Sequence, residues 1–350
     1  MPVHRPFWTA VMAVSLVVAT AAGAQSPHTA YHVLHRYQVG GDGGWDYLTF
    51  DTVGHRLFIA RQNRVMVVDP DHGTVLGEIP GLGGAHGVAL AYETGHGFIT
   101  SGRDSTVTMF DLKTLQVLGK TIAAQDADAI LYDPASKRVF TFNGDARSSS
   151  VIDPVSGKRL GNIDLGAEPE FGVSAGNGKL YVNLTKNGDV AEIDAKKMQV
   201  TRRWSAAPCK GSTGLAIDRV THRLFSGCRN KVMAISDAKQ GRLIATLPID
   251  GGVDATTFDP RTHNAFSSNG DGTLTIIHED TPNRFRVIET VPTMKGARTM
   301  TLDPKTHHVY LVSAQFGPPP ADSTAANPRR RPPVLPGTFT VLVVGTDPGK

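Results

Sequence analysis

The amino-acid sequence predicts an all-β fold, namely a seven-bladed β-propeller whose blades have four strands each. Three observations support this prediction. An eight-residue motif occurs seven times, a second motif recurs in phase with it, and each repeat holds four short β-strand patterns. Repeats of about 40 to 50 residues with four strands each are typical of propeller blades.

The first motif begins with Asp and ends with an aromatic residue, as in the segments 51–58, 133–140 and 218–225. Segments 259–266 and 303–310 repeat it, and 91–98 and 174–181 are weaker copies. The closing aromatic residues are Phe58, Phe98, Phe140, Tyr181, Phe225, Phe266 and Tyr310. The second motif contains an apolar residue, followed directly by Asp in the first four copies, at 67–69, 109–111, 151–153, 192–194, 235–236, 277–278 and 344–345. Two motifs in phase over seven copies predict seven equivalent units.

Within the first repeat, four segments are rich in β-branched and aromatic residues: 47–50, 56–60, 65–68 and 75–79. Turn residues separate them, because Asp and Pro stabilise tight turns. The last repeat ends after its third expected strand, 338–344. The N-terminal segment Tyr31 to Val39 belongs to no other repeat, so we expect it to supply the missing strand and to close the ring without an exposed sheet edge.

Composition excludes several other classes of protein. Of 350 residues, 40% are hydrophobic and 19% charged, which allows a sizeable core and excludes a disordered chain. A net charge of +4 without a basic stripe is typical of a soluble protein and indicates no particular partner. We expect a monomer.

The first 24 residues predict a cleaved signal peptide. An apolar run at 7–21 follows His4 and Arg5, and Ala22-Gly23-Ala24 resembles a cleavage site. We therefore expect a periplasmic or secreted protein, with residues 25–350 as one domain and no membrane span in the mature chain.

The best candidate for a ligand site is the position just before the core of each inner strand. Loops entering the inner strands share one face of a propeller, so these residues should surround the mouth of its central channel. The positions hold Asp46, His86, Asp128, Pro169, Thr213, Asp254 and Arg298, with Glu168 and Glu170 beside the fourth. Carboxylates, imidazole and guanidinium gathered there could bind a polar ligand or a divalent metal. The alternative is that they only cap strands and line a wet channel, and we favour that alternative slightly.

Other motifs point to structure rather than to chemistry. His55, His222, His263 and His307 share one position in turns of the opposite face and should lie too far apart to bind one metal. The segment Gly172 to Gly176 has the G-x-S-x-G spacing of a nucleophile elbow but no helix pattern after it. No haem, P-loop or zinc motif occurs in the sequence.

Cys209 and Cys228 are the two cysteines of the chain. Folding the hairpin about its turn at 218–223 brings them to the same end of their blade. An exported protein allows them to oxidise, so we expect a disulfide. The alternative is two free thiols.

A proline-rich insertion at about 316–336 contains Arg329, Arg330 and Arg331. It should emerge on the channel-mouth face, either as a solvated loop or as a basic patch for a partner. It has no aromatic residues between its arginines for stacking on bases, which argues against nucleic-acid binding.

With both motifs in place, the chain resembles the YVTN-repeat, YncE-like family of exported seven-bladed propellers over residues 31 to 345. The segments 223–230, 266–273 and 336–340 look like that family. The resemblance implies the fold and the compartment, and single-stranded DNA binding is attributed to at least one member. Related seven-bladed folds include lactonases, lyases and amine dehydrogenase subunits, so activity does not follow from the fold.

The sequence thus favours an exported module that binds a ligand or a protein at the channel-mouth face. The first alternative is an enzyme of lactonase or lyase type with a divalent metal held among Asp46, His86, Asp128, Glu170 and Asp254, where Arg298 stabilises developing charge. Single-stranded DNA binding is the second alternative.

Overall fold

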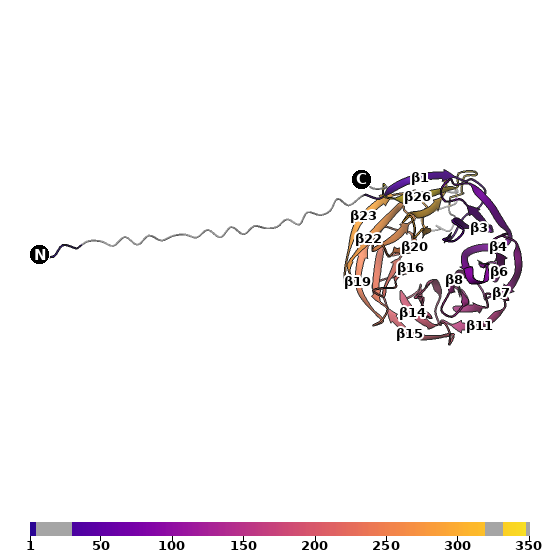
Figure 1. Ribbon diagram of the computed structural model, residues 1–350, viewed down its shortest axis with the longest axis horizontal. Coiled ribbons are helices and arrows are strands. Elements are labelled where there is room, and N and C mark those ends of the chain that lie inside the picture. The colour runs from indigo at the N-terminus through magenta and orange to yellow at the C-terminus, as the bar shows by residue number, and fades with distance from the viewer. Residues whose placement is uncertain (5–29, 319–331, 348–350) are drawn as a thin grey trace.

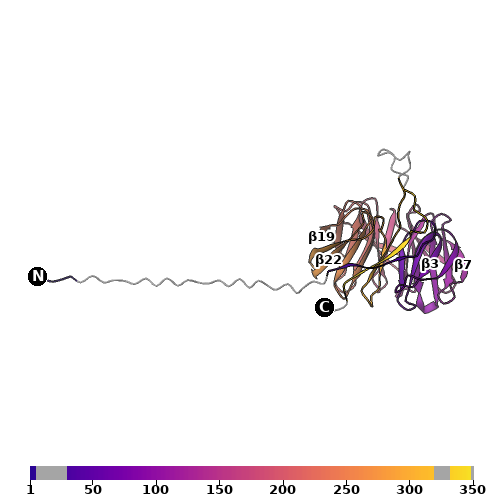
Figure 2. The same cartoon turned by 90° about the horizontal axis from the view of Figure 1, so that it is seen from above.

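A computed structural model describes residues 1–4, 30–318 and 332–347 of the chain. Its sheets stand side by side around a ring, and the side view shows strands that span the thickness of this ring (Figures 1 and 2). All of them are antiparallel β-sheets, and the described residues include a single short helical turn, η1 (Tyr92–Thr94). The expected signal peptide at 1–24 falls mainly outside the described residues, and so do Arg329 to Arg331.

Five sheets have four strands each. One holds β1 (His32–Gln38), β26 (Thr340–Gly345), β25 (Val309–Ser313) and β24 (Met300–Leu302). Another holds β8 (Ala127–Asp133), β9 (Arg138–Asn143), β10 (Ser148–Ile152) and β11 (Arg159–Asp164). The next has β12 (Pro169–Ser174), β13 (Lys179–Leu184), β14 (Asp189–Asp194) and β15 (Gln199–Ser205). The fourth has β16 (Ser212–Asp218), β17 (Arg223–Cys228), β18 (Val232–Asp237) and β19 (Arg242–Pro248). The fifth has β20 (Val253–Asp259), β21 (Asn264–Asn269), β22 (Thr273–Thr281) and β23 (Arg284–Pro292).

The sixth sheet has six strands and corrects the prediction of seven separate blades. It contains β2 (Leu48–Asp51), β3 (Arg56–Val68), β4 (Val75–Ala91), β5 (His96–Ser101), β6 (Thr106–Asp111) and β7 (Val117–Ile122). Each of the long strands β3 and β4 covers two of the strands expected from the repeat. Gln62 pairs with Ala85, so the hydrogen-bonded ladder continues from the first repeat into the second. The described part of the chain therefore forms six sheets, not seven.

The repeated eight-residue motif builds the hairpin between the first two strands of a repeat. Its Asp accepts hydrogen bonds from turn N–H groups, as Asp51 Oδ1 does from Val53 and Gly54. Its fifth residue takes positive φ in the turn, between 50° and 64° at His55, Lys137, His222, His263 and His307. Such a turn satisfies the backbone locally and reverses the chain. The expectation that the four histidines are turn residues is confirmed.

The core lies between neighbouring sheets. The closing aromatic residues Phe58, Phe98, Phe140, Phe225 and Phe266 have no exposed surface. Where the ring closes, the rings of Phe50 and Tyr310 stack with centroids 5.6 Å apart, joining the six-stranded sheet to the sheet of β24–β26. Packing sheet face against sheet face is what makes the strand pattern apolar on both sides.

The predicted closure by the N-terminal strand is confirmed. β1 pairs antiparallel with β26 from His32–Gly345 to Gln38–Thr340, and the two lie side by side at the top of Figure 1. The outer strand of this sheet thus comes from the opposite end of the chain to its inner three strands. Nothing among the described residues forms a helix long and apolar enough to cross a membrane.

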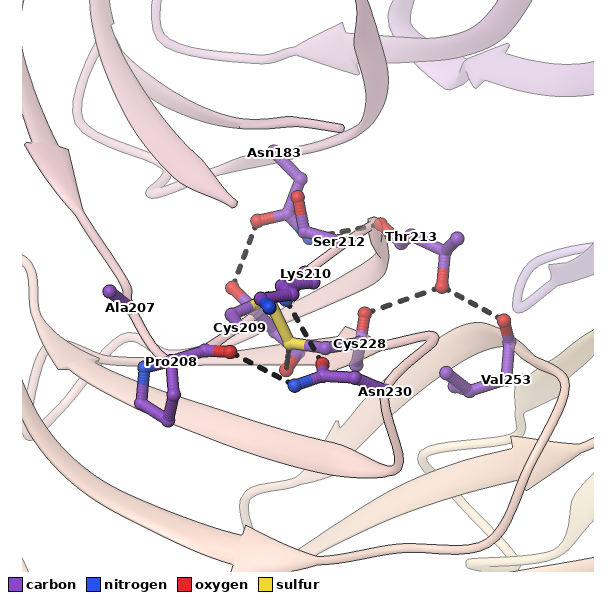
Figure 3. Close-up of a disulfide and its surroundings, with 12 residues drawn as sticks. Asn183, Ala207, Pro208, Cys209, Lys210, Ser212, Thr213, Cys228, Asn230 and Val253 are labelled. Atoms are coloured by element: carbon purple, nitrogen blue, oxygen red, sulfur yellow. Dashed lines mark hydrogen bonds between the residues drawn. A yellow bond between two sulfur atoms is a disulfide. The ribbon is translucent and has the colours of Figure 1, made fainter. Parts of the chain in front are cut away.

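The expected disulfide is present. Cys209 and Cys228 are bonded with Cα atoms 5.5 Å apart, and Ser212 pairs with Cys228 across the hairpin (Figure 3). Asn230 receives a hydrogen bond from Lys210 N and donates one to Pro208 O, so the loop before β16 is fixed beside the disulfide.

Candidate functional site

The site residues predicted from the repeat lie at the starts of the inner strands. Asp46 and Arg298 each precede an inner strand by two residues, while His86, Asp128 and Asp254 lie within β4, β8 and β20. Single backbone hydrogen bonds join the segments at which neighbouring inner strands begin: Tyr47 N donates to His86 O, and Ala255 N donates to Arg298 O. This places charged side chains from separate repeats at one end of the ring.

His86 lies between two carboxylates. Its Nδ1 is 2.5 Å from Asp46 Oδ2 and 3.2 Å from Asp128 Oδ1. Burial opposes the charged imidazole, but the hydrogen bond to Asp46 and the negative charge of Asp128 outweigh it and raise the pKa of His86 to about 9. Burial, together with the charge of Asp46, raises the pKa of Asp128 well above its usual value. Asp128 Oδ1 is buried and receives no well-directed hydrogen bond from the described residues.

Arg298 connects the group of His86, Asp46 and Asp128 to a third carboxylate, that of Asp254. Its Nε donates to Asp254 Oδ2 at 2.7 Å, and its Nη2 lies 3.7 Å from Asp46 Oδ1 and donates to Trp45 O at 3.1 Å. Burial disfavours the charged guanidinium, but the Asp254 and Asp46 carboxylates raise the pKa of Arg298. Burial raises the pKa of Asp254. Asp46, His86, Asp128, Asp254 and Arg298 are therefore joined by direct contacts, and we call these five residues the mouth cluster.

Glu170 lies outside this chain of direct contacts. Its nearest described ionic partner is Arg229, whose Nη2 is 3.8 Å from Oε1. Burial, with the Asp254 charge, raises the pKa of Glu170 to about 7. Among the other predicted positions, Thr213 is buried and donates to Val253 O. Pro169 offers no side-chain donor, and Glu168 is exposed.

Sequence reasoning missed Tyr47 and Arg229. Tyr47 is buried beneath the mouth cluster and packs against Phe171 of β12, with ring centroids 5.0 Å apart. Burial, followed by the charge of Asp128, raises the pKa of the Tyr47 hydroxyl well above its usual value. Tyr47 directly follows Asp46, so the repeat phase could have located it, whereas Arg229 lies in a loop that the motifs do not reach.

Ser174 has no nucleophile geometry. It ends β12, its hydroxyl donates to Asp133 Oδ1 at 2.5 Å, and no helix follows it among the described residues. The G-x-S-x-G spacing is therefore part of a strand and its turn, as expected.

The chain matches no protein-family profile and no curated protein sequence. Solved structures share its fold. A chain of hydrazine synthase from Kuenenia stuttgartiensis is 17% identical with a TM-score of 0.69, over 77% of this chain and 92% of that chain. A chain of a mitotic checkpoint complex is 14% identical with a TM-score of 0.70, over 87% of this chain and 95% of that chain. At such identities the similarity concerns the propeller fold alone.

Proposed function

We propose that this protein is a binding module that captures a small polar ligand at the mouth cluster. The supporting observation is the convergence of three carboxylates, one imidazole and one guanidinium from five repeats on one end of the ring. Their side chains are between 16% and 30% exposed, so they are largely desolvated yet reachable. Partly desolvated polar groups that converge on one place are typical of ligand sites.

A second candidate function is metal-dependent catalysis of lactonase or lyase type. One ligand atom each from Asp46, His86 and Asp128 lies within 4.8 Å of the others, a spacing that suits a divalent cation. Two carboxylates and an imidazole would hold such an ion, which would act as a Lewis acid. Arg298, fixed by Asp254, would stand beside it to stabilise negative charge.

We further propose that the protein is exported and belongs to the YVTN-repeat, YncE-like propellers. The seven sequence repeats support this proposal. The Cys209–Cys228 disulfide is compatible with an extracellular location.

The binding proposal is tested by a thermal-shift titration with three ligand classes: divalent cations, alkylamines and organic anions. The wild type is compared with the double variant Asp46→Asn/Asp128→Asn, which keeps the shape of the cluster but removes two charges. We expect at least one class to raise the melting temperature of the wild type and to have little effect on the variant, because a ligand that binds only the folded state stabilises it.

Asp145→Asn is the matched control, because Asp145 is an exposed carboxylate outside the mouth cluster. It should respond as the wild type does. If the double variant responds to every ligand as strongly as the wild type, the mouth cluster is not the binding site. Dependence on a divalent cation alone would favour the metal-dependent candidate.

A further inference from the structure

A cavity of about 1200 Å³ lies beside the mouth cluster and shares Arg298 with it. Its apolar wall includes Trp45, Met294, Phe316 and Val334. Glycine backbone forms much of the rest, including Gly43 and Gly44. The side chain of Gln62, which also lines the cavity, lies over Gly43 and Gly44. The volume is sufficient for a small organic molecule.

The charged side chains that line this cavity are both basic. Lys295 and Arg298 are the charged residues among its described lining, which contains no carboxylate. The Nε and Nη2 atoms of Arg298 are held by Asp254 and by Trp45 O, which fixes the guanidinium in place. No described residue accepts a hydrogen bond from its Nη1, so one edge of a preorganised cation is available to an anion.

Neighbouring side chains pack against Trp45 and fix the aromatic wall of the cavity. Trp45 is 7% exposed and packs between Phe316 and Phe339, with ring centroids 6.0 Å and 5.5 Å away. The fully buried Arg61 stacks on Phe339 with its guanidinium carbon 3.6 Å from the ring centroid.

Arg61 also fixes the glycine wall. It donates hydrogen bonds to the carbonyl oxygens of all five residues from Gly40 to Gly44. The loop that lines the cavity is therefore tied to the same buried guanidinium that supports the aromatic wall. A preformed wall reduces the entropy lost when a ligand binds.

We propose that this cavity binds an organic anion with a planar, apolar body. The anionic group would pair with Arg298 and Lys295, and the planar body would lie against Phe316 and Met294 of the apolar wall. This inference goes beyond the proposed function, because it places a second ligand in a cavity that shares Arg298 with the mouth cluster and none of its carboxylates. It also assigns a role to Trp45 and Phe316, which the mouth cluster does not use.

The test is isothermal titration calorimetry of the full mature chain with three probes. 2-Naphthoate has both the ring and the charge, 2-naphthamide has the ring without the charge, and acetate has the charge without the ring. We expect 2-naphthoate to bind at one site and at least about tenfold more tightly than 2-naphthamide, because a charged hydrogen-bonded pair contributes that much or more. Acetate should show no measurable heat of binding at millimolar concentration.

Two substitutions separate the contributions of charge and ring. Lys295 is exposed, and Lys295→Gln should weaken the binding of 2-naphthoate about threefold and leave the affinity for 2-naphthamide unchanged. Phe316→Ala should weaken the binding of both naphthalene probes. Lys113→Gln, at an exposed turn that the cavity lining does not include, is the matched control and should change neither.

Equal affinity for 2-naphthoate and 2-naphthamide, or binding that Phe316→Ala does not alter, would overturn the inference. Should 2-naphthoate fail to bind while divalent cations or amines still stabilise the wild type through Asp46 and Asp128, the inference is wrong and the proposed function stands. If no probe of any charge binds, both are wrong.

Discussion

Glu279 is a residue at which this chain departs from its own repeat. Equivalent positions in five other repeats hold an Asp whose carboxylate accepts turn N–H groups, as Asp111 and Asp153 do. Glu279 has one more methylene group and is 4% exposed, within the lengthened strand β22. Burial, with the nearby charge of Asp218, raises the pKa of Glu279 to about 7.

The raised pKa of Glu279 predicts how stability depends on pH. In the unfolded chain this carboxyl titrates near 4.5, so the folded state binds more protons between pH 4.5 and 7. The stabilising contribution is complete below pH 4.5 and is lost as the pH rises through 7. We expect Glu279→Gln to increase the free energy of unfolding at pH 8 by about 2 kcal/mol and to change it little at pH 4.5. Urea denaturation at the two pH values measures this effect.

The exposed Glu93 supplies the control variant, since Glu93→Gln should leave the pH dependence as it is in the wild type. A Glu279→Gln protein with the same loss of stability between pH 4.5 and 8 as the wild type would show that Glu279 does not cause that loss.

Among the elements, β1 completes the sheet of β24, β25 and β26. It covers the edge of β26 and brings Tyr31 against Phe266 of the neighbouring sheet, with ring centroids 5.6 Å apart. Without β1, the edge of β26 would be free to pair with other chains. We expect deletion of residues 31–38 to lower the melting temperature by on the order of 10 °C and to cause aggregation.

Differential scanning calorimetry and light scattering measure these two effects. Arg36→Gln, at an exposed residue of β1, is the control and should melt as the wild type does. A deletion variant that stays monomeric with an unchanged melting temperature would contradict the closing role of β1.

The Cys209–Cys228 disulfide supports the loop that leads into β16. The two cysteines are 19 positions apart, and a loop of that size is worth about 3 kcal/mol in the chain-entropy treatment. We expect Cys209→Ala/Cys228→Ala to have a free energy of unfolding about 3 kcal/mol lower than that of the wild type, as measured by urea denaturation. Reductant should lower the stability of the wild type to a similar value and leave the variant unchanged. Equal stability of the oxidised wild type and the variant would show that the crosslink contributes nothing.

At the scale of the whole molecule, the repeat motifs predicted the strands, the turns and the closure of the ring. They did so because each motif is local: an Asp caps its own turn, and an aromatic residue fills the space between two sheets. They did not predict the six-stranded sheet. The pairing of Gln62 with Ala85 depends on how two loops from different repeats meet, and no local pattern encodes that contact.

The candidate site was likewise predictable only where its residues follow the repeat. Repeat phase places Asp46, His86 and Asp128 at equivalent positions, and the structure brings them within contact distance. Arg229 was not predictable because its loop has no repeated motif, and it pairs with Glu170 from another sheet. The ligand-binding role of the mouth cluster remains a prediction.

Native mass spectrometry tests that role most directly. The wild-type protein is purified without chelator and compared with Asp46→Asn/Asp128→Asn. We predict a bound mass, either a metal ion or a small molecule, on the wild type that is absent from the double variant. A bare chain in both preparations, or the same bound mass on both, would contradict the assignment of ligand binding to the mouth cluster.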